Sequence, residues 1–203
     1  MNKTSSVQFF DTQFQRQISL GEFTLNPFET MALPYLQGRV LDFGCGLGNL
    51  AIAAAQRGCE VVALDASPAA IQHLQHIALA KKLPIEAAVA DLKNHVINEQ
   101  FDAVVSIGLL MFFDCATALH QLVQLQEKVR PGGTVIINVL VAGTSYLDMF
   151  DAQGYCLFER DELTRRFASW ETLHHVFQDF PAPNERVKSF ATIVAQKPLL
   201  GTD

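Results

Sequence analysis

The stretch that decides the fold runs from Val40 to Asn49 and reads VLDFGCGLGN. Its apolar residues predict a short buried strand that carries an acid, Asp42, near its end. Three glycines at alternate positions follow, and the alanine-rich run after them is typical of a helix. A strand that breaks into glycines and restarts as a helix is typical of a nucleotide-binding turn, because glycine lets the backbone close on the ligand.

The glycine spacing separates two kinds of nucleotide cofactor. In the dinucleotide fingerprint G-x-G-x-x-G the third glycine stands one position later, where this chain has Asn49. The carboxylate of Asp42 would also repel a pyrophosphate, whereas it suits a cofactor that carries an ammonium and a sulfonium group. The stretch from Asp42 to Gly48 resembles motif I of the class I S-adenosylmethionine-dependent methyltransferases, acid-x-Gly-x-Gly-x-Gly. An NAD-dependent oxidoreductase is the alternative, since Asp65 alone would suit the ribose of either cofactor.

Composition and charge narrow the class of protein. The chain has 203 residues, 49% of them hydrophobic and 18% charged, which favours one domain with a parallel sheet covered on both faces. The net charge of −6 argues against nucleic acid as a partner, because binding phosphates needs clustered Lys and Arg. No apolar run approaches the roughly 20 residues of a membrane span, and the N-terminus shows no signal-peptide core. We therefore expect a cytoplasmic protein without a membrane partner, either a monomer or a homodimer.

The cysteines give no sign of a metal site or of a disulfide framework. None of them shows the C-x-x-C spacing of zinc ligands. The four are Cys45, Cys59, Cys115 and Cys156. This pattern predicts four reduced thiols, and we expect no bound metal.

The order of predicted elements indicates an α/β fold. Strands alternate with helices through most of the chain, and two strands joined by a short loop end it. The strands predicted after the first are residues 60–64, 85–89, 101–107, 134–140, 171–180 and 189–196. Residues 130–133, Arg-Pro-Gly-Gly, read as a turn before the fifth strand. The resemblance implies a doubly wound, seven-stranded, mostly parallel, Rossmann-like sheet with an antiparallel last strand.

Acids at the ends of the next two strands complete the predicted cofactor site. Asp65 ends the second strand, where a carboxylate meets a ribose diol, and Ser67 is already a good N-cap for the following helix. The resemblance places Asp91 at the adenine amino group and the backbone amide of Leu92 at a ring nitrogen. The cofactor-binding residues expected in this way are Arg16, Asp42, Gly44, Cys45, Gly46, Asp65, Ala66, Asp91, Leu92, Ser106 and Ile107.

The side that receives the methyl acceptor is predicted to be apolar. Residues 109–113, LLMFF, follow the fourth strand where the resemblance puts the reaction site. Residues 143–158 form a connection long enough for a functional loop. The predicted acceptor pocket consists of Phe10, Phe14, Leu109, Met111, Phe112, Tyr146 and Arg186. No general base stands out, so the catalytic residues stay unassigned.

The whole chain resembles the small tellurite-resistance-type and thiopurine-type methyltransferases in its length, its short N-terminal extension and its ending over residues 189–195. This implies methyl transfer from S-adenosylmethionine to a small-molecule acceptor by direct in-line displacement, with S-adenosylhomocysteine as product. Arg186 matches an Arg of the tellurite enzymes, but Asp179-Phe180 stands where their His-Arg pair is expected. That departure argues against tellurite itself. A catalytically silent cofactor-binding module is the second hypothesis.

The N-terminal residues 1–36 are predicted to form a helical lid or extension beside a methyltransferase domain of residues 37–203. Phe9, Phe10 and Phe14 share one face of the predicted helix and would dock on the apolar rim. Arg16 is the only Arg before Arg39, and its planar fork suits the carboxylate of the cofactor. The alternative is a solvated Arg16 on a bracing helix.

Overall fold

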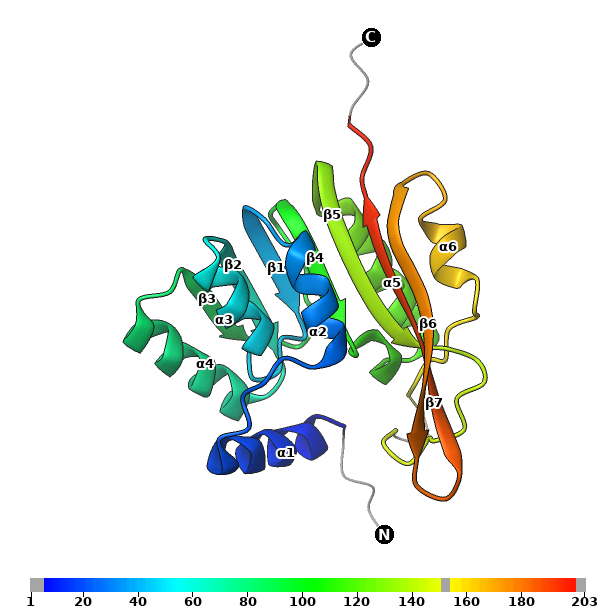
Figure 1. Ribbon diagram of the computed structural model, residues 1–203, viewed down its shortest axis with the longest axis horizontal. Coiled ribbons are helices and arrows are strands. Elements are labelled where there is room, and N and C mark those ends of the chain that lie inside the picture. Colours follow the sequence, from blue (N-terminus) through cyan, green and yellow to red (C-terminus); the bar gives the residue numbers. More distant parts are fainter. Residues whose placement is uncertain (1–5, 151–153, 200–203) are drawn as a thin grey trace.

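A seven-stranded sheet forms the centre of the protein, and the computed structural model describes residues 6–150 and 154–199 (Figure 1). The strand order is β3-β2-β1-β4-β5-β7-β6, and every neighbouring pair is parallel except the two that involve β7. The strands are β1 (Arg39–Phe43), β2 (Glu60–Asp65), β3 (Ile85–Val89), β4 (Phe101–Ile107), β5 (Val129–Leu140), β6 (Glu171–Ala182) and β7 (Arg186–Gln196). The predicted fold class and the antiparallel last strand are confirmed.

Helices cover both faces of this sheet, with α3 and α4 on one side and α5 on the other (Figure 1). Strand alternation explains the two layers, because Val105 packs with Leu50 and Leu74 while its neighbour Val104 packs with Leu122. The helices are α1 (Ser6–Leu20), α2 (Pro27–Ala32), α3 (Asn49–Gln56), α4 (Pro68–Lys81), α5 (Cys115–Glu127) and α6 (Glu162–Arg166). Two short 3-10 helices are η1 (Leu33–Tyr35) and η2 (Leu110–Phe112).

Backbone bonds and close packing fix the glycine turn between β1 and α3. The amides of Gly44 and Cys45 donate to the carbonyl of Leu64 at 2.8 and 3.0 Å, which ties the turn to the end of β2. Gly48 has φ +74°, and a Cβ there would lie 2.5 Å from the side chain of Leu74. Only glycine satisfies both conditions, so the predicted strand–turn–helix unit is confirmed.

The Pro-Gly-Gly stretch is part of a strand, and its prediction as a turn is wrong. Strand β5 begins at Val129, and its pairing with β4 shifts register between Phe101 and Ala103. A Cβ at Gly133 would lie 2.6 Å from the carbonyl oxygen of Asp102. The glycine therefore allows a β-bulge at which the neighbouring backbone approaches closely.

The prediction of four reduced thiols is also wrong. Cys115 and Cys156 form a disulfide across a sequence separation of 41 residues, while Cys45 and Cys59 are free and buried. Cys115 begins α5, and Cys156 lies in the connection between β5 and α6. The pair meets because this connection returns to the end of the sheet, which no local spacing reveals.

The N-terminal helix α1 lies across the carboxyl ends of the parallel strands (Figure 1). None of its residues is buried, so it rests on the domain without entering its core. Phe10 and Phe14 face the domain, but Phe9 is 48% exposed and departs from the predicted shared face. Among the described helices, none is both long and apolar enough to cross a membrane.

Candidate functional site

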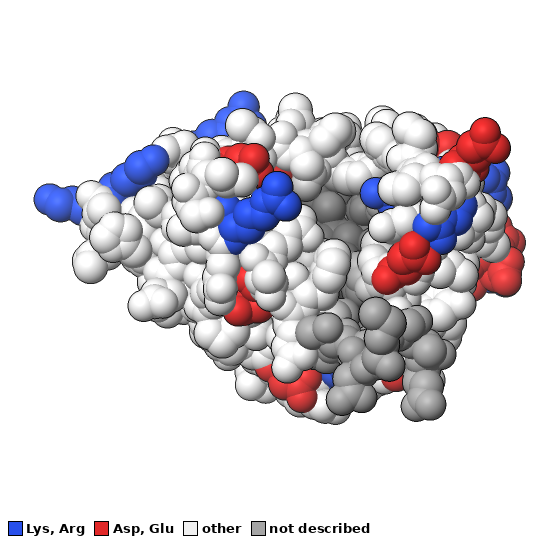
Figure 2. All heavy atoms as spheres, turned by 90° about the horizontal axis from the view of Figure 1, so that it is seen from below, with Lys and Arg blue, Asp and Glu red and all other residues white. Residues whose placement is uncertain are grey.

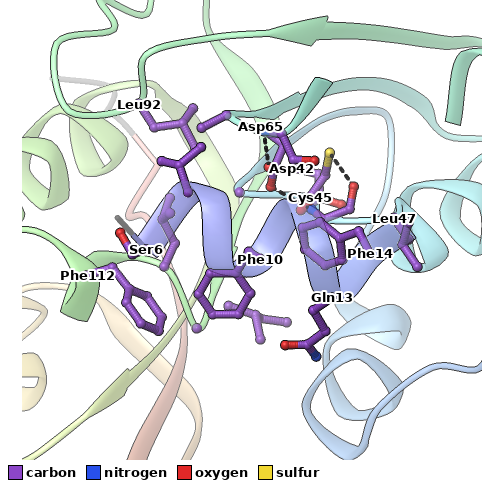
Figure 3. A pocket seen from close by; sticks show the side chains of 18 of the residues that line it. Ser6, Phe10, Gln13, Phe14, Asp42, Cys45, Leu47, Asp65, Leu92 and Phe112 are labelled. Atoms are coloured by element: carbon purple, nitrogen blue, oxygen red, sulfur yellow. Dashed lines mark hydrogen bonds between the residues drawn. The ribbon is translucent and has the colours of Figure 1, made fainter. Parts of the chain in front are cut away.

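A cavity of about 520 Å³ opens between α1 and the carboxyl ends of β1, β2 and β4 (Figure 3). The strand order reverses between β1 and β4, because β2 and β3 lie on one side and the later strands on the other. Ligands of open α/β sheets bind at such a switch point, where the connections diverge and leave a crevice. The glycine turn forms one wall, and α1 closes the side opposite the sheet.

Asp42 is the most unusual group in this cavity. Its side chain is only 5% exposed, and its Oδ2 has no hydrogen-bond partner among the described residues. Burial raises the pKa of Asp42 well above its usual value, and the neighbouring carboxylates of Glu29 and Asp65 raise it further. A buried acceptor without a donor is costly, so this site fits a ligand that brings a cationic hydrogen-bond donor.

Glu29 is a second carboxylate at the same end of the cavity, and the sequence reasoning missed it. It belongs to a capping box: Asn26 caps the start of α2, and Glu29 accepts from the Asn26 amide at 2.7 Å. Burial raises the pKa of Glu29 although this hydrogen bond opposes the shift. The Asn-x-x-Glu spacing was a sequence signal for the cap, but only the packing of α2 brings the side chain to Asp42.

Asp65 holds the glycine turn in place as well as facing the cavity. Its two oxygens accept from the amides of Gly46 and Ser67, each at 2.8 Å, as the dashed lines around it in Figure 3 partly show. Burial raises the pKa of Asp65, and these amides act in the opposite direction. Ser67 does cap α4, through the amide of Ala70 at 3.1 Å. A carboxylate has about four acceptor positions, so Asp65 can still accept a hydrogen bond from a ligand hydroxyl.

Most of the other predicted cofactor residues also line the cavity. Leu92 is buried, and Asp91 accepts from the side-chain amide of Asn94 at 2.8 Å, which orients its carboxylate. The predicted residues that the cavity brings together are Asp42, Gly44, Cys45, Gly46, Asp65, Ala66, Asp91, Leu92 and Ile107.

Ser106 and Arg16 do not line the cavity. Ser106 is fully buried and follows Val105 on β4, so strand alternation turns it to the sheet face that α5 covers. Arg16 is exposed on α1, whereas Gln13 and Gln17 of the same helix line the cavity. The one-residue offset on a helix explains the difference, because neighbouring residues point about 100° apart.

Some of the residues predicted to form the acceptor pocket line the cavity, and others do not. Phe10, Phe14, Leu109 and Phe112 line the cavity, and Met111 is buried in the cluster behind it. Tyr146 and Arg186 lie outside the cavity lining. Arg186 binds Asp148 through two hydrogen bonds of 2.7 Å, and its guanidinium carbon lies 4.8 Å from the centre of the Tyr146 ring.

One contact joins α1 to the start of α4, two residues after Asp65. Asp11 accepts from the hydroxyl of Ser67 and from the amide of Ala69, the latter at 3.3 Å. A carboxylate from a separate helix thereby completes the N-terminal cap of α4. Around the described residues, no group of three or more His, Cys, Asp or Glu side chains can hold a metal ion.

Comparison with known proteins places the chain in a family. The family model described as tellurite resistance protein TehB matches residues 29–179. The "Probable S-adenosyl-L-methionine-dependent methyltransferase TehB" of Haemophilus influenzae strain 10810 is 27% identical over 166 residues, which cover 78% of this chain and 57% of that protein. Hemagglutinin 1 of Eikenella corrodens is 28% identical over 167 residues, covering 79% and 55%. The chain thus spans little more than half the length of these relatives.

Solved structures share the fold. The crystal structure of TehB from Haemophilus influenzae superposes with a TM-score of 0.75 at 21% identity, over 89% of this chain and 65% of that one. The N-methyltransferase NodS from Bradyrhizobium japonicum, in complex with S-adenosyl-L-homocysteine, gives 0.71 at 16% identity, over 96% and 100%. Helix α1 precedes the residues that the family model matches.

Proposed function

Since the chain belongs to the TehB family of S-adenosylmethionine-dependent methyltransferases, we propose that it transfers a methyl group from S-adenosylmethionine to a small-molecule acceptor by direct in-line displacement. The observation that carries this proposal is the buried carboxylate of Asp42, which faces the cavity beside the glycine turn with one oxygen unpaired. An ammonium group would satisfy that oxygen. The pyrophosphate of a dinucleotide would be repelled by it, which weighs against an NAD-dependent oxidoreductase.

The cavity residues suggest how the cofactor would be held. Asp42 and Glu29 would take the ammonium of the methionine part, and Asp65 would take the ribose hydroxyls. Asp91 and Leu92 would bind the adenine. Bound S-adenosylmethionine supplies an electrophilic methyl group on a sulfonium.

The protein is proposed to align the reactants for the displacement and to exclude water from them. The lone pair of the acceptor forms the bond to the methyl carbon as the carbon–sulfur bond breaks with its electrons left on sulfur. A proton on the acceptor atom would pass to the bulk solvent outside the cavity. The apolar side chains of Leu109, Phe10 and Phe112 exclude water around the reacting atoms, which favours a step in which charge is neutralised.

The acceptor is proposed to be small because of the charges on one face of the protein and the shape of the cavity. Lys and Arg side chains on the face below the sheet stand apart, interspersed with Asp and Glu, and form no continuous basic patch on its described part (Figure 2). The cavity itself is roofed by α1 and is about 520 Å³ in volume. Both features suit a molecule that fits beneath this helix beside the cofactor.

The N-terminal helix α1 is proposed to act as a lid. It supplies Phe10, Gln13, Phe14 and Gln17 to the cavity but buries none of its own residues. A contact of Arg16 with the cofactor carboxylate would require α1 to turn about its axis from the orientation described. If Arg16→Ala leaves the cofactor affinity unchanged, Gln13 and Gln17 are the candidate partners for that carboxylate.

Calorimetry with two cofactors tests the proposal. S-adenosylhomocysteine should bind tightly and NAD should not, and Asp65→Ala should weaken S-adenosylhomocysteine by about 1.5–3 kcal/mol, the range for a hydrogen bond to a charged group. Tight binding of NAD without binding of S-adenosylhomocysteine would contradict the proposed function. Tight cofactor binding with no transfer to a wide panel of acceptors would favour the catalytically silent module.

A further inference from the structure

A row of aromatic rings runs from the cavity into the connection after β5. Successive ring centroids lie 6.0 Å apart for Phe14 and Phe10, 4.9 Å for Phe10 and Phe112, 5.0 Å for Phe112 and Phe150, and 4.8 Å for Phe150 and Tyr155. The first three rings line the cavity. In Figure 3 the rings of Phe10 and Phe112 lie together, apart from the carboxylates of Asp42 and Asp65. The cavity therefore has an acidic wall and an aromatic wall.

The charges around the cavity are nearly all negative. Its described lining contains four carboxylates, those of Glu29, Asp42, Asp65 and Asp91, and one cation, Lys93. Lys93 is exposed, and its Nζ lies over the ring of Phe113, 5.9 Å from the ring centre. Apart from this engaged side chain, no described lining residue offers a cation to an anionic ligand on Phe10 and Phe112.

The cations nearest the aromatic row along β7 are already engaged. Arg186 forms its paired hydrogen bonds with Asp148, and the Nζ of Lys188 lies 5.7 Å from the centre of the Tyr146 ring. Neither side chain lines the cavity. The neighbouring part of the β6–β7 hairpin adds another ring instead, because Phe180 packs against Phe190 with centroids 5.7 Å apart.

From this arrangement we infer that the methyl acceptor is an uncharged organic molecule whose apolar, ring-bearing body packs on Phe10 and Phe112, and that inorganic oxyanions are poor acceptors. The inference rests on the proposed methyl transfer. An anion packed on Phe10 and Phe112 would lose its hydration there, and the lining cation, Lys93, is already placed over the Phe113 ring. A neutral aromatic body loses little hydration and gains edge-to-face contacts with the rings. Tellurite, the oxyanion that appears in the family's description as a resistance, does not fit this wall.

The test compares two thiols that differ by one charge. Benzyl mercaptan is neutral, and 4-(mercaptomethyl)benzoate carries a carboxylate on the same ring and thiol. Their binding to the protein saturated with S-adenosylhomocysteine is measured by calorimetry, with tellurite and selenite as further probes. We expect benzyl mercaptan to bind at least about tenfold more tightly than its carboxylated analogue and the oxyanions. Equal or tighter binding of any anion, or no binding of the neutral thiol, overturns the inference.

Three substitutions locate the binding. Phe112→Leu should weaken benzyl mercaptan about tenfold and leave S-adenosylhomocysteine affinity unchanged, whereas Phe177→Leu, the same change at a ring that is 41% exposed on β6, should alter neither. Phe10→Lys, on a helix without buried residues, should reverse the preference in favour of 4-(mercaptomethyl)benzoate. An unchanged preference in Phe10→Lys contradicts the inference. Loss of S-adenosylhomocysteine binding by the unmodified protein would instead contradict the proposed function.

Discussion

At the scale of single residues, the buried carboxylate of Asp42 destabilises the ligand-free protein and is proposed to bind the cofactor. Its carboxylate is buried, has an unpaired oxygen and faces two further carboxylates. Natural proteins keep such groups where binding requires them, at the expense of stability. The ligand-free protein should therefore be less stable than a variant that lacks this charge.

Asp42→Asn should stabilise the ligand-free protein and weaken the cofactor. If removal of the buried charge raises the free energy of unfolding by about 1 kcal/mol, the Tm of a chain of this size rises by roughly 2–4 °C. S-adenosylhomocysteine affinity should fall by about 1.5–3 kcal/mol, since a charged hydrogen bond is lost. Thermal melts and calorimetry measure the two effects. Asp179→Asn, the same change at an exposed site on β6, is the control and should change neither.

The pH dependence of the ligand-free protein follows from the same group. Burial raises the pKa of Asp42 in the folded chain, so the folded state holds this proton more tightly than the unfolded state does. The stability contribution is fully present below the unfolded pKa of about 3.9 and is lost as pH rises through the folded pKa. Cofactor affinity should show the opposite trend and rise with pH, because the ionised carboxylate binds the ammonium. In Asp42→Asn, both stability and cofactor affinity should depend less on pH. The remaining pH dependence is expected to come from Glu29 and Asp65.

At the scale of elements, α1 is the part of the site with the weakest attachment. It buries no residue, and one polar link between it and the domain is the contact of Asp11 with Ser67 and Ala69 at the start of α4. Elements with few buried contacts open without unfolding the rest of a protein. Because the amide of Ser67 donates to the carboxylate of Asp65 at the end of β2, occupation of the ribose position and closure of α1 should support each other.

Asp11→Ala should loosen α1 and lower the Tm of the ligand-free protein only slightly, because Ser67 still caps α4 through the amide of Ala70. Trypsin cleavage after Arg16 reports opening of this helix. S-adenosylhomocysteine should slow that cleavage in the unmodified protein and slow it much less in Asp11→Ala. Thr12→Ala, which alters the exposed neighbour on the same helix, should behave like the unmodified protein. Equal protection of the unmodified protein and Asp11→Ala would show that Asp11 does not couple the lid to the cofactor.

At the scale of the whole molecule, the disulfide between Cys115 and Cys156 links the start of α5 to the connection that carries Tyr155. A covalent link between segments 41 residues apart restricts the unfolded chain. It also holds the end of the aromatic row beside η2, where the amide of Cys156 donates to the carbonyl of Met111 at 3.0 Å.

Replacing both cysteines with Ala should lower the free energy of unfolding by about 2–4 kcal/mol, the usual range for a native disulfide. Denaturant melts with and without a reductant measure this. The unmodified protein should lose the same amount on reduction, and the double variant should be insensitive to the reductant. S-adenosylhomocysteine affinity should remain, since neither cysteine lines the cavity. Equal stability of oxidised and reduced protein would mean that the link does not form in solution.

The sequence by itself determined the features that depend on neighbouring residues. The glycine turn from Asp42 to Gly48, the cap at Ser67 and the strand over residues 101–107 follow from backbone sterics, local hydrogen bonds and hydrophobic periodicity. Together with the resemblance to class I methyltransferases, they predicted the fold and many of the residues that line the cavity. These effects act within a few residues of the chain.

Only the tertiary structure decided which distant side chains meet. It brought Glu29 beside Asp42, joined Cys115 to Cys156 and made Gly133 part of a bulge by placing the backbone of Asp102 against it. It also turned Ser106 and Arg16 away from the cavity. Each outcome depends on how whole elements pack and in which register they pair, and a shift of one position on a strand or helix changes the direction of a side chain without altering the local sequence pattern.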